Sequence, residues 1–362
     1  MKVTLATGIY PPDIGGPATY VERLSRELSS QLKSLTVVTF SAGEDRVEEG
    51  GDWKVVRVSK GGGPLVRWSR YSAALREHAK GSDIVYAFSS VSAGVPVWMA
   101  RIKHAKKILR LGGDFAWERY TDKGGDLSLT EWYESKPRFQ GLMNGMLNTF
   151  DHIVFSTEFQ EHLYERFYQR LPLHSVIENA VPGGRPTEHE ARSPFRLLFL
   201  GRFVAFKNLG ALLKALPEVP EALLTIVGEG PMESALREQV KEEGLSDRVS
   251  FRPVMTGSEK RDLFDEHDLL LLPSLTELSP NAALEARAAG LPVLLTEQTG
   301  LSTALTDGAM LRPLRTPREI AQGIREAMTG YEALAARAAS AIPERLWSTV
   351  ASEHLTLFRS LL

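Results

Sequence analysis

Short apolar runs alternate with amphipathic helical patterns along the chain, and this alternation restricts its fold more than any other feature. Residues 269–272 are short and apolar enough for a fully buried strand, and after a polar turn residues 280–289 are rich in helix formers and end at Gly290. Strands that alternate with helices favour a doubly wound parallel sheet, with binding loops at the carboxyl ends of the strands. We therefore predict an α/β fold.

The same alternation predicts strands and helices in both halves of the chain. In the first half the expected strands are 2–7, 35–40, 53–58, 83–88, 108–111 and 153–156, and the expected helices are 19–32, 70–80, 95–107 and 138–150. In the second half the expected strands are 196–200, 222–227, 249–251, 269–272 and 293–296, and the expected helices are 209–216, 232–243, 258–267, 280–289 and 343–362.

A break in the pattern separates two domains. A chain of 362 residues is long enough for two domains with separate cores. Residues 182–194 lose hydrophobic periodicity and concentrate glycine, proline and charge, which is typical of a linker. We predict one domain over 1–185 and a second over 195–342.

Composition excludes several classes of protein. The formal net charge of −2, from 43 basic and 45 acidic residues, argues against a nucleic-acid binder that depends on bulk charge. The lack of cysteine excludes disulfides, thiolate metal sites and a cysteine nucleophile. The apolar run 3–9 is too short for a signal sequence, and no run of about 18 apolar residues is present. We expect a cytoplasmic protein without a membrane span.

The segment 269–293 combines a strand, a turn and a helix start. Ser279 is a good N-cap and Pro280 suits the first helical position, so the amides of this helix start form a ready anion site. Glu277 lies just before the cap, and Glu285 lies about one and a half turns inside the helix. Taken singly, each carboxylate is more typical of a solvated loop or helix face than of a ligand site.

Three further loops follow strands and carry residues suited to phosphate. Arg202 and Lys207 follow the strand 196–200, where a guanidinium and an ammonium suit a diphosphate. Gly228 and Glu229 belong to the glycine-rich loop GEGP after the strand 222–227, and Gly15-Gly16 follows the first strand. Solvated basic side chains and ordinary turns are the alternative interpretations of these loops.

The order of these motifs resembles the retaining glycosyltransferases of family 4, which have the GT-B fold. The second half reads strand, GR-x4-KN, strand, GEGP, strand and E-x7-E, and the resemblance extends to the first loop YPPDIGG, the tail EARAAGLPV and Trp347. It implies two Rossmann-like domains that face each other across a cleft. The acceptor would bind mainly to the first domain and the nucleotide-sugar mainly to the second, and residues 343–362 would cross back to the first domain.

The resemblance also implies roles for individual residues. Arg202 and Lys207 would neutralise the donor diphosphate and the departing nucleotide, Glu285 would accept hydrogen bonds from the ribose, and Glu277 would hold hydroxyls of the transferred sugar. The other donor-binding residues that it implies are Gly15, Gly16, Gly228, Glu229, Leu278, Ser279, Pro280 and Asn281.

One position departs from the family pattern. Many members carry a histidine near the reacting carbon, at the end of the fourth or fifth strand of the first domain, where this chain reads LGGDFAWE. Asp114 is the only ionisable candidate there for a catalytic role, and a turn or capping aspartate is the alternative. A donor phosphate oxygen can take the acceptor proton, so the missing histidine does not exclude transfer. Acceptor choice is expected to depend on loops around Phe115, Trp117 and Tyr120.

No metal or other cofactor is expected. The chain has no Asp-x-Asp motif and no histidine pair with metal-ligand spacing, and Arg202, Lys207 and the helix start at Ser279 supply positive potential. The expected partners are a nucleotide-sugar donor and a saccharide, lipid-linked or small-molecule acceptor, with cell-envelope polysaccharide as the predicted setting and no nucleic acid. A basic run from Arg101 to Arg110 beside Trp98 indicates either a contact with anionic membrane or a solvated helix face.

We therefore predict a metal-independent, retaining glycosyltransferase. A GT-B sugar-nucleotide epimerase and a phosphorylase are the alternatives among enzymes, and a sugar-nucleotide-binding protein without turnover is the alternative from another class. A two-domain dehydrogenase is disfavoured, because no strand is followed by G-x-G-x-x-G with an acidic residue about 20 positions on.

Overall fold

In the computed structural model the chain divides into two compact units. Its described residues are 1–13, 15–49, 51–137, 140–181, 183–184, 186–340 and 344–362. Unit 1 comprises residues 1–116, 135–180 and 346–362, and unit 2 comprises residues 117–134 and 181–345. Residues 138, 182 and 343, at which three of the expected segments begin, lie outside the described part of the chain.

Unit 1 is built on a sheet with the strand order β3-β4-β2-β1-β5-β6-β7-β8, parallel except for the pairing of β3 with β4. Its strands are β1 (Lys2–Thr7), β2 (Ser34–Ser41), β3 (Arg46–Glu48), β4 (Lys54–Ser59), β5 (Ile84–Phe88), β6 (Lys106–Leu111), β7 (His152–Phe155) and β8 (Leu173–Val176). Its helices include α1 (Gly16–Ser29), α2 (Pro64–His78), α3 (Val95–Ala100), α6 (Gln140–Leu147), α7 (Glu158–Phe167) and α15 (Trp347–Leu361).

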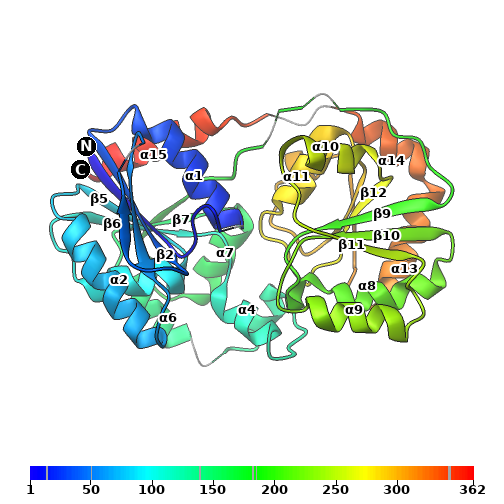
Figure 1. The fold of residues 1–362 in the computed structure, drawn as a ribbon, viewed down its shortest axis with the longest axis horizontal. Helices are drawn as coiled ribbons and strands as arrows, with labels where there is room; N and C mark the ends of the chain where they lie inside the picture. The colour runs from blue at the N-terminus through cyan, green and yellow to red at the C-terminus, as the bar shows by residue number, and fades with distance from the viewer. Residues whose placement is uncertain (14, 50, 138–139, 182, 185, 341–343) are drawn as a thin grey trace. The chain divides into compact units, whose positions relative to one another are not determined.

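The C-terminal helix belongs to the unit that the N-terminus begins. Helices α1 and α15 lie on one face of the first sheet, and α2 and α6 lie on the other (Figure 1). Phe358 of α15 is fully buried against Tyr86 of β5, with ring centroids 5.7 Å apart. The return of the last helix to the first unit, which the family resemblance implied, is therefore present in the structure.

The expected helix over 95–107 is wrong beyond Ala100. Helix α3 ends where Arg101 adopts the left-handed conformation, and the chain then enters β6, which pairs with β5 and β7. Pairing in the sheet overrides the helical propensity of the lysine-rich segment. The basic run therefore occupies a turn and a strand, and its last member, Arg110, is buried and donates to Ile177 O and Asn179 Oδ1.

Unit 2 contains a fully parallel sheet with the strand order β11-β10-β9-β12-β13-β14. Its strands are β9 (Phe195–Leu200), β10 (Ala222–Val227), β11 (Val249–Arg252), β12 (Leu269–Leu272), β13 (Val293–Thr296) and β14 (Ala309–Arg312). Its helices include α4 (Phe115–Thr121, of which residues from 117 belong here), α5 (Leu129–Glu134), α8 (Leu209–Ala215), α9 (Glu233–Glu242), α10 (Gly257–Asp265), α11 (Asn281–Ala289), α12 (Thr303–Thr306), α13 (Pro317–Thr329) and α14 (Tyr331–Ala338).

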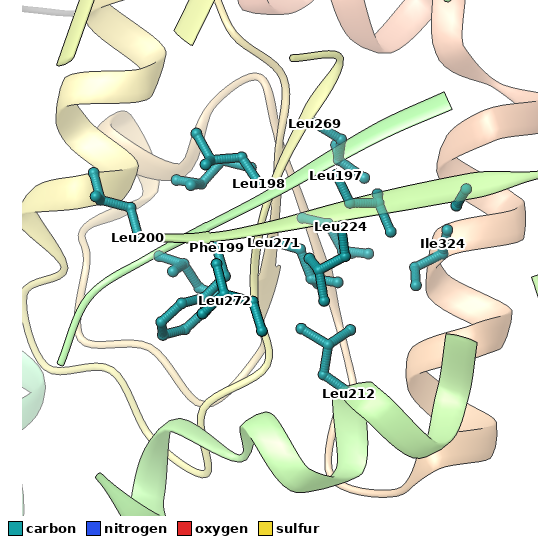
Figure 2. Packing of buried hydrophobic residues seen from close by; sticks show 14 of the residues in the cluster. Leu197, Leu198, Phe199, Leu200, Leu212, Leu224, Leu269, Leu271, Leu272 and Ile324 are labelled. Atoms are coloured by element: carbon teal, nitrogen blue, oxygen red, sulfur yellow. The ribbon is translucent and has the colours of Figure 1, made fainter. Parts of the chain in front are cut away.

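Burial of the central strands explains why the apolar runs located them well. Helices α8 and α9 cover one face of the second sheet, and α10 and α11 cover the other (Figure 1). Leu212 of α8 and Ile324 of α13 point toward the sheet, and both are fully buried (Figure 2). Leu269 and Leu271 of β12 are fully buried as well, as expected of a parallel strand covered on both faces.

Residues 117–134 pack with unit 2 although they come from the first half of the chain. The amide of Leu129 donates to Thr276 Oγ1 at 2.9 Å, and both residues are buried. Helices α4 and α5, like β3, β8, β14, α7, α13 and α14, were not among the predicted elements. Besides the change of unit near the linker 182–194, the chain therefore also changes unit around residues 117–134. No local pattern in the sequence predicts this.

Candidate donor-binding site

The parallel strands of unit 2 bring the predicted motifs of the second half to one edge of its sheet. β9 lies between β10 and β12 and is parallel to both, so the loops that follow these three strands emerge at the same, carboxyl end. These loops carry Arg202 and Lys207 after β9, Gly228 and Glu229 after β10, and Glu277 after β12. The structure thus assembles, within one unit, residues that lie up to 75 positions apart in the sequence.

Glycine is required in the loop after β10 because that loop packs on the backbone of the loop after β9. A Cβ on Gly228 would meet the carbonyl oxygen of Gly201 at 1.9 Å, and one on Gly230 would meet Phe203 O at 2.5 Å. The amide of Phe203 also donates to Glu229 O at 2.8 Å. The two loops therefore pack backbone against backbone, and a side chain at either glycine would push them apart.

Lys207 and Glu277 form the central ion pair of the site. Lys207 Nζ donates to Glu277 Oε1 at 2.5 Å, and the Ser274 hydroxyl donates to the same oxygen at 2.6 Å. The Glu277 side chain is 6% exposed and that of Lys207 16%, so water screens this pair less than a surface pair. The cation expected on the diphosphate and the carboxylate expected on the sugar are thus in direct contact.

Backbone hydrogen bonds fix the loop that carries Glu277. The Glu277 amide donates to Gln298 O at 2.9 Å, and the Gly300 amide donates to Glu277 O at 2.7 Å. The Leu275 amide donates to Phe206 O at 2.8 Å, which joins this loop to the one that carries Lys207. Each loop is therefore held by its neighbour along the sheet edge, and the Glu277 carboxylate is preorganised before any ligand binds.

Arg202 and Glu229 reach solvent at the same edge. Both side chains are exposed, and neither has an ion pair with another described residue. An exposed guanidinium is available to an incoming anion without first breaking an internal pair, in contrast to the Lys207 ammonium.

Glu285 has a partner that the sequence motifs did not indicate. Lys260 of α10 forms an ion pair with Glu285 Oε2 of α11, and the two side chains are 24% and 34% exposed. Lys260 sits in no motif, and only the adjacent packing of α10 and α11 identifies it. A carboxylate that keeps one oxygen on an ammonium still offers a lone pair on each oxygen to hydroxyl donors.

The helix start differs by one residue from the prediction. Pro280, with ψ of 96°, is the N-cap residue of α11, so the expected N-cap role of Ser279 is wrong. The helix begins at Asn281 because Pro280 keeps an extended ψ. Leu278 and Pro280 are buried beside Glu277, while Asn281 is exposed at the first turn.

Gly15 and Gly16 lie in unit 1, where Gly15 caps the N-terminus of α1. Gly15 has φ of 153°, and a Cβ there would meet Ile9 Cδ1 at 2.8 Å, so the turn needs glycine. An added Cβ on Gly16 would meet nothing within 4 Å. The start of α1 is thus open at Gly16, as close approach of a ligand to this backbone requires.

Asp114 follows β6 in unit 1 and is 4% exposed. Tyr164 Oη of α7 donates to Asp114 Oδ2 at 2.8 Å, and Tyr164 is also buried. The carboxylate therefore has a fixed partner inside its own unit. Its catalytic role stays a prediction.

No group of three or more potential metal ligands occurs among the residues that the structure describes. Metal-independent transfer therefore stays a prediction, which a chelation experiment tests.

Residues 194–329, which include most of unit 2, match the family model "Glycosyl transferases group 1". An uncharacterized glycosyltransferase of Methanocaldococcus jannaschii is 24% identical over an alignment of 402 positions, which covers 99% of this chain and 98% of the relative. Sucrose-phosphate synthase from Thermosynechococcus elongatus superposes with a TM-score of 0.80 at 18% identity, over 99% of this chain and 98% of that one. Anabaena HepE in complex with UDP and glucose superposes with a TM-score of 0.71 at 17% identity, over 99% and 100% of the two chains.

These similarities show that the chain has the GT-B fold, with two doubly wound parallel-sheet units. The family match falls on the unit that holds Arg202, Lys207, Glu277 and Glu285. Fold and family match together support a GT-B glycosyltransferase.

Proposed function

We propose that this protein is a retaining, metal-independent glycosyltransferase that uses a nucleoside diphosphate sugar as donor. The observation that carries the proposal is the contact of Lys207 with Glu277 at the carboxyl edge of the unit 2 sheet, with Arg202 exposed on the same loop as Lys207. A diphosphate needs fixed cations, and sugar hydroxyls need a carboxylate acceptor, so this edge offers complementary groups to both parts of one donor.

The proposed transfer takes place in one step and needs no protein nucleophile. The bond from the anomeric carbon to the β-phosphate oxygen breaks, the acceptor oxygen bonds to that carbon from the same face, and the acceptor proton passes to the departing phosphate. Arg202 and Lys207 stabilise the negative charge that develops on the diphosphate. Glu277 holds the sugar hydroxyls, and Glu285 holds the ribose hydroxyls, which keeps both carboxylates away from the phosphate charge.

Asp114 fits a positioning role in this scheme better than that of a base. Its buried carboxylate accepts from the Tyr164 hydroxyl, so a proton transfer to Asp114 would have to compete with that hydrogen bond. Asp114→Asn tests this interpretation, because an amide oxygen still accepts from Tyr164 but is no base. Retained turnover in Asp114→Asn is the expected result, and loss of turnover without loss of stability would make Asp114 a base.

We further propose that the acceptor is a saccharide or a lipid-linked saccharide, and that unit 1 touches an anionic membrane. Leu65 and Val66 at the start of α2 and Trp98 on α3 are exposed, and α2 packs against α3. Arg101 and Lys103 follow α3 and are exposed, which gives the apolar side chains basic neighbours. Among the described residues, no helix has the length and apolar character needed to cross a membrane. Salt-sensitive co-sedimentation with anionic vesicles, lost in Trp98→Ser, is the expected result.

Proton NMR of donor turnover tests the reaction. A retaining transferase gives a product, or slowly hydrolysed free sugar, whose anomeric configuration first matches that of the donor. Epimerised free sugar would indicate the epimerase, dependence on inorganic phosphate would indicate the phosphorylase, and tight donor binding with neither transfer nor hydrolysis would indicate a non-catalytic binding protein. An inverted anomer would contradict retention.

A further inference from the structure

Residues 117–134 contact both loops that carry the Lys207–Glu277 pair. The Trp117 ring lies 5.2 Å from the Phe206 ring, centroid to centroid, at an interplanar angle of 44°. Trp117 is 3% exposed, and its Nε1 donates to Leu127 O at 2.9 Å. The indole is therefore held by this hydrogen bond as well as by the ring contact. An aromatic pair in this geometry is favourable beyond the area that it buries.

The contact with Phe206 reaches Lys207 directly. Phe206 precedes Lys207, and the Lys207 ammonium lies over the Phe206 ring, 5.2 Å from its centroid. The same ammonium donates to Glu277. Trp117, Phe206, Lys207 and Glu277 thus form one continuous series of contacts, all inside unit 2.

A second, independent contact reaches the loop of Glu277. The Leu129 amide donates to Thr276 Oγ1, and this hydroxyl donates to Leu275 O at 2.7 Å. Thr276 is 2% exposed and immediately precedes Glu277. Because both groups are buried, loss of the Thr276 hydroxyl would leave the Leu129 amide without this acceptor.

Exposed ion pairs add little to the contact of residues 117–134 with the rest of unit 2. Arg315 lies 3.1 Å from Glu131 and 3.5 Å from Asp126, but these three side chains are 40%, 45% and 79% exposed. Exposed pairs contribute at most about 1 kcal/mol each. The buried contacts of Trp117 and Leu129 therefore contribute more than these ion pairs to holding the segment.

We propose that residues 117–134 form a buttress of the donor site, in which Trp117 is a positioning residue that acts through Phe206 on Lys207. The inference rests on the proposed function only in taking Lys207 as a donor contact. For Trp117 it replaces the expected role in acceptor choice, because the Trp117 ring packs against Phe206 on a donor-side loop of unit 2.

A double-mutant cycle tests the route through Lys207. UDP, the nucleotide in the similar HepE structure, is the first probe, followed by GDP and ADP, with calorimetry on Trp117→Leu, Lys207→Ala and the double variant. Trp117→Leu is expected to weaken binding about 5- to 20-fold, Trp117→Phe to restore most of it, and the double variant to bind no more weakly than Lys207→Ala. Additive losses would overturn the route through Lys207.

Hydrogen exchange tests the buttress without activity or ligand. In Trp117→Leu and in the nearly isosteric Thr276→Val, amide exchange is expected to accelerate at Leu275 and Glu277 and to stay unchanged in α9. If no nucleotide binds the wild type but exchange accelerates as expected, the proposed function fails and the buttress stands. Unchanged exchange at both amides in both variants would refute the buttress.

Discussion

Lys207 Nζ donates to Glu277 Oε1 at 2.5 Å, although 70 positions separate the two residues in the sequence. The pair keeps the Glu277 carboxylate oriented without a ligand, and it holds Lys207 at the sheet edge. A donor that places its diphosphate near Lys207 and its sugar near Glu277 would share an existing ion pair instead of organising two mobile side chains.

Replacing the Glu277 carboxylate is expected to reduce turnover more than donor binding. Glu277→Gln removes a charged acceptor of hydrogen bonds from the sugar hydroxyls, and a hydrogen bond to a charged group is worth about 1.5–3 kcal/mol, or about 10- to 150-fold in kcat. Steady-state kinetics with calorimetric donor Kd separates the two effects. Glu297→Gln, an exposed acid beyond β13, is the matched control and should leave kcat unchanged.

Lys260→Met is expected to weaken donor binding up to about fivefold, because the Lys260–Glu285 pair is partly exposed and worth at most about 1 kcal/mol. Without the ammonium, the Glu285 charge would repel the diphosphate of a donor bound through its ribose. Lys260→Arg should bind the donor as the wild type does, and Lys241→Met, an exposed lysine of α9, should have no effect. Equal affinities in Lys260→Met and wild type would mean that the pair does not contribute to binding.

The pH dependence of stability has a defined source in unit 1. Burial, with a smaller contribution from His174, lowers the pKa of His152 from 6.5 to about 4. As pH falls below 6.5 the unfolded chain takes up this proton first, so the free energy of unfolding decreases toward pH 4 with a slope of at most about 1.4 kcal/mol per pH unit. Chemical denaturation of His152→Gln should show a flatter profile, and His162→Gln, an exposed control, should keep the wild-type slope.

Chelation is expected to leave transfer unchanged. Arg202, Lys207 and the start of α11 provide the positive potential that a divalent ion supplies elsewhere. Initial rates measured before and after EDTA treatment should agree. Activity lost to EDTA and restored by Mg²⁺ or Mn²⁺ would contradict this prediction.

Local patterns in the sequence specified the second sheet well because its strands are buried on both faces. The predicted strands 222–227, 269–272 and 293–296 match β10, β12 and β13 residue for residue. Sequence reasoning failed where tertiary packing decides. The segment after Ala100 has helical propensity but pairs in a sheet. Trp117 and Lys260 contact residues so far away in the sequence that no periodic pattern identifies these partners.

Titration of wild-type protein and Glu285→Ala with UDP-, GDP-, ADP- and dTDP-sugars in a calorimeter tests the central claim most directly. One nucleotide sugar is expected to bind the wild type, and Glu285→Ala is expected to bind it at least about 10-fold more weakly, because a charge-assisted hydrogen bond to ribose is lost. Absence of binding by every nucleotide sugar, or equal affinity in wild type and variant, would contradict the placement of the donor at this edge of unit 2.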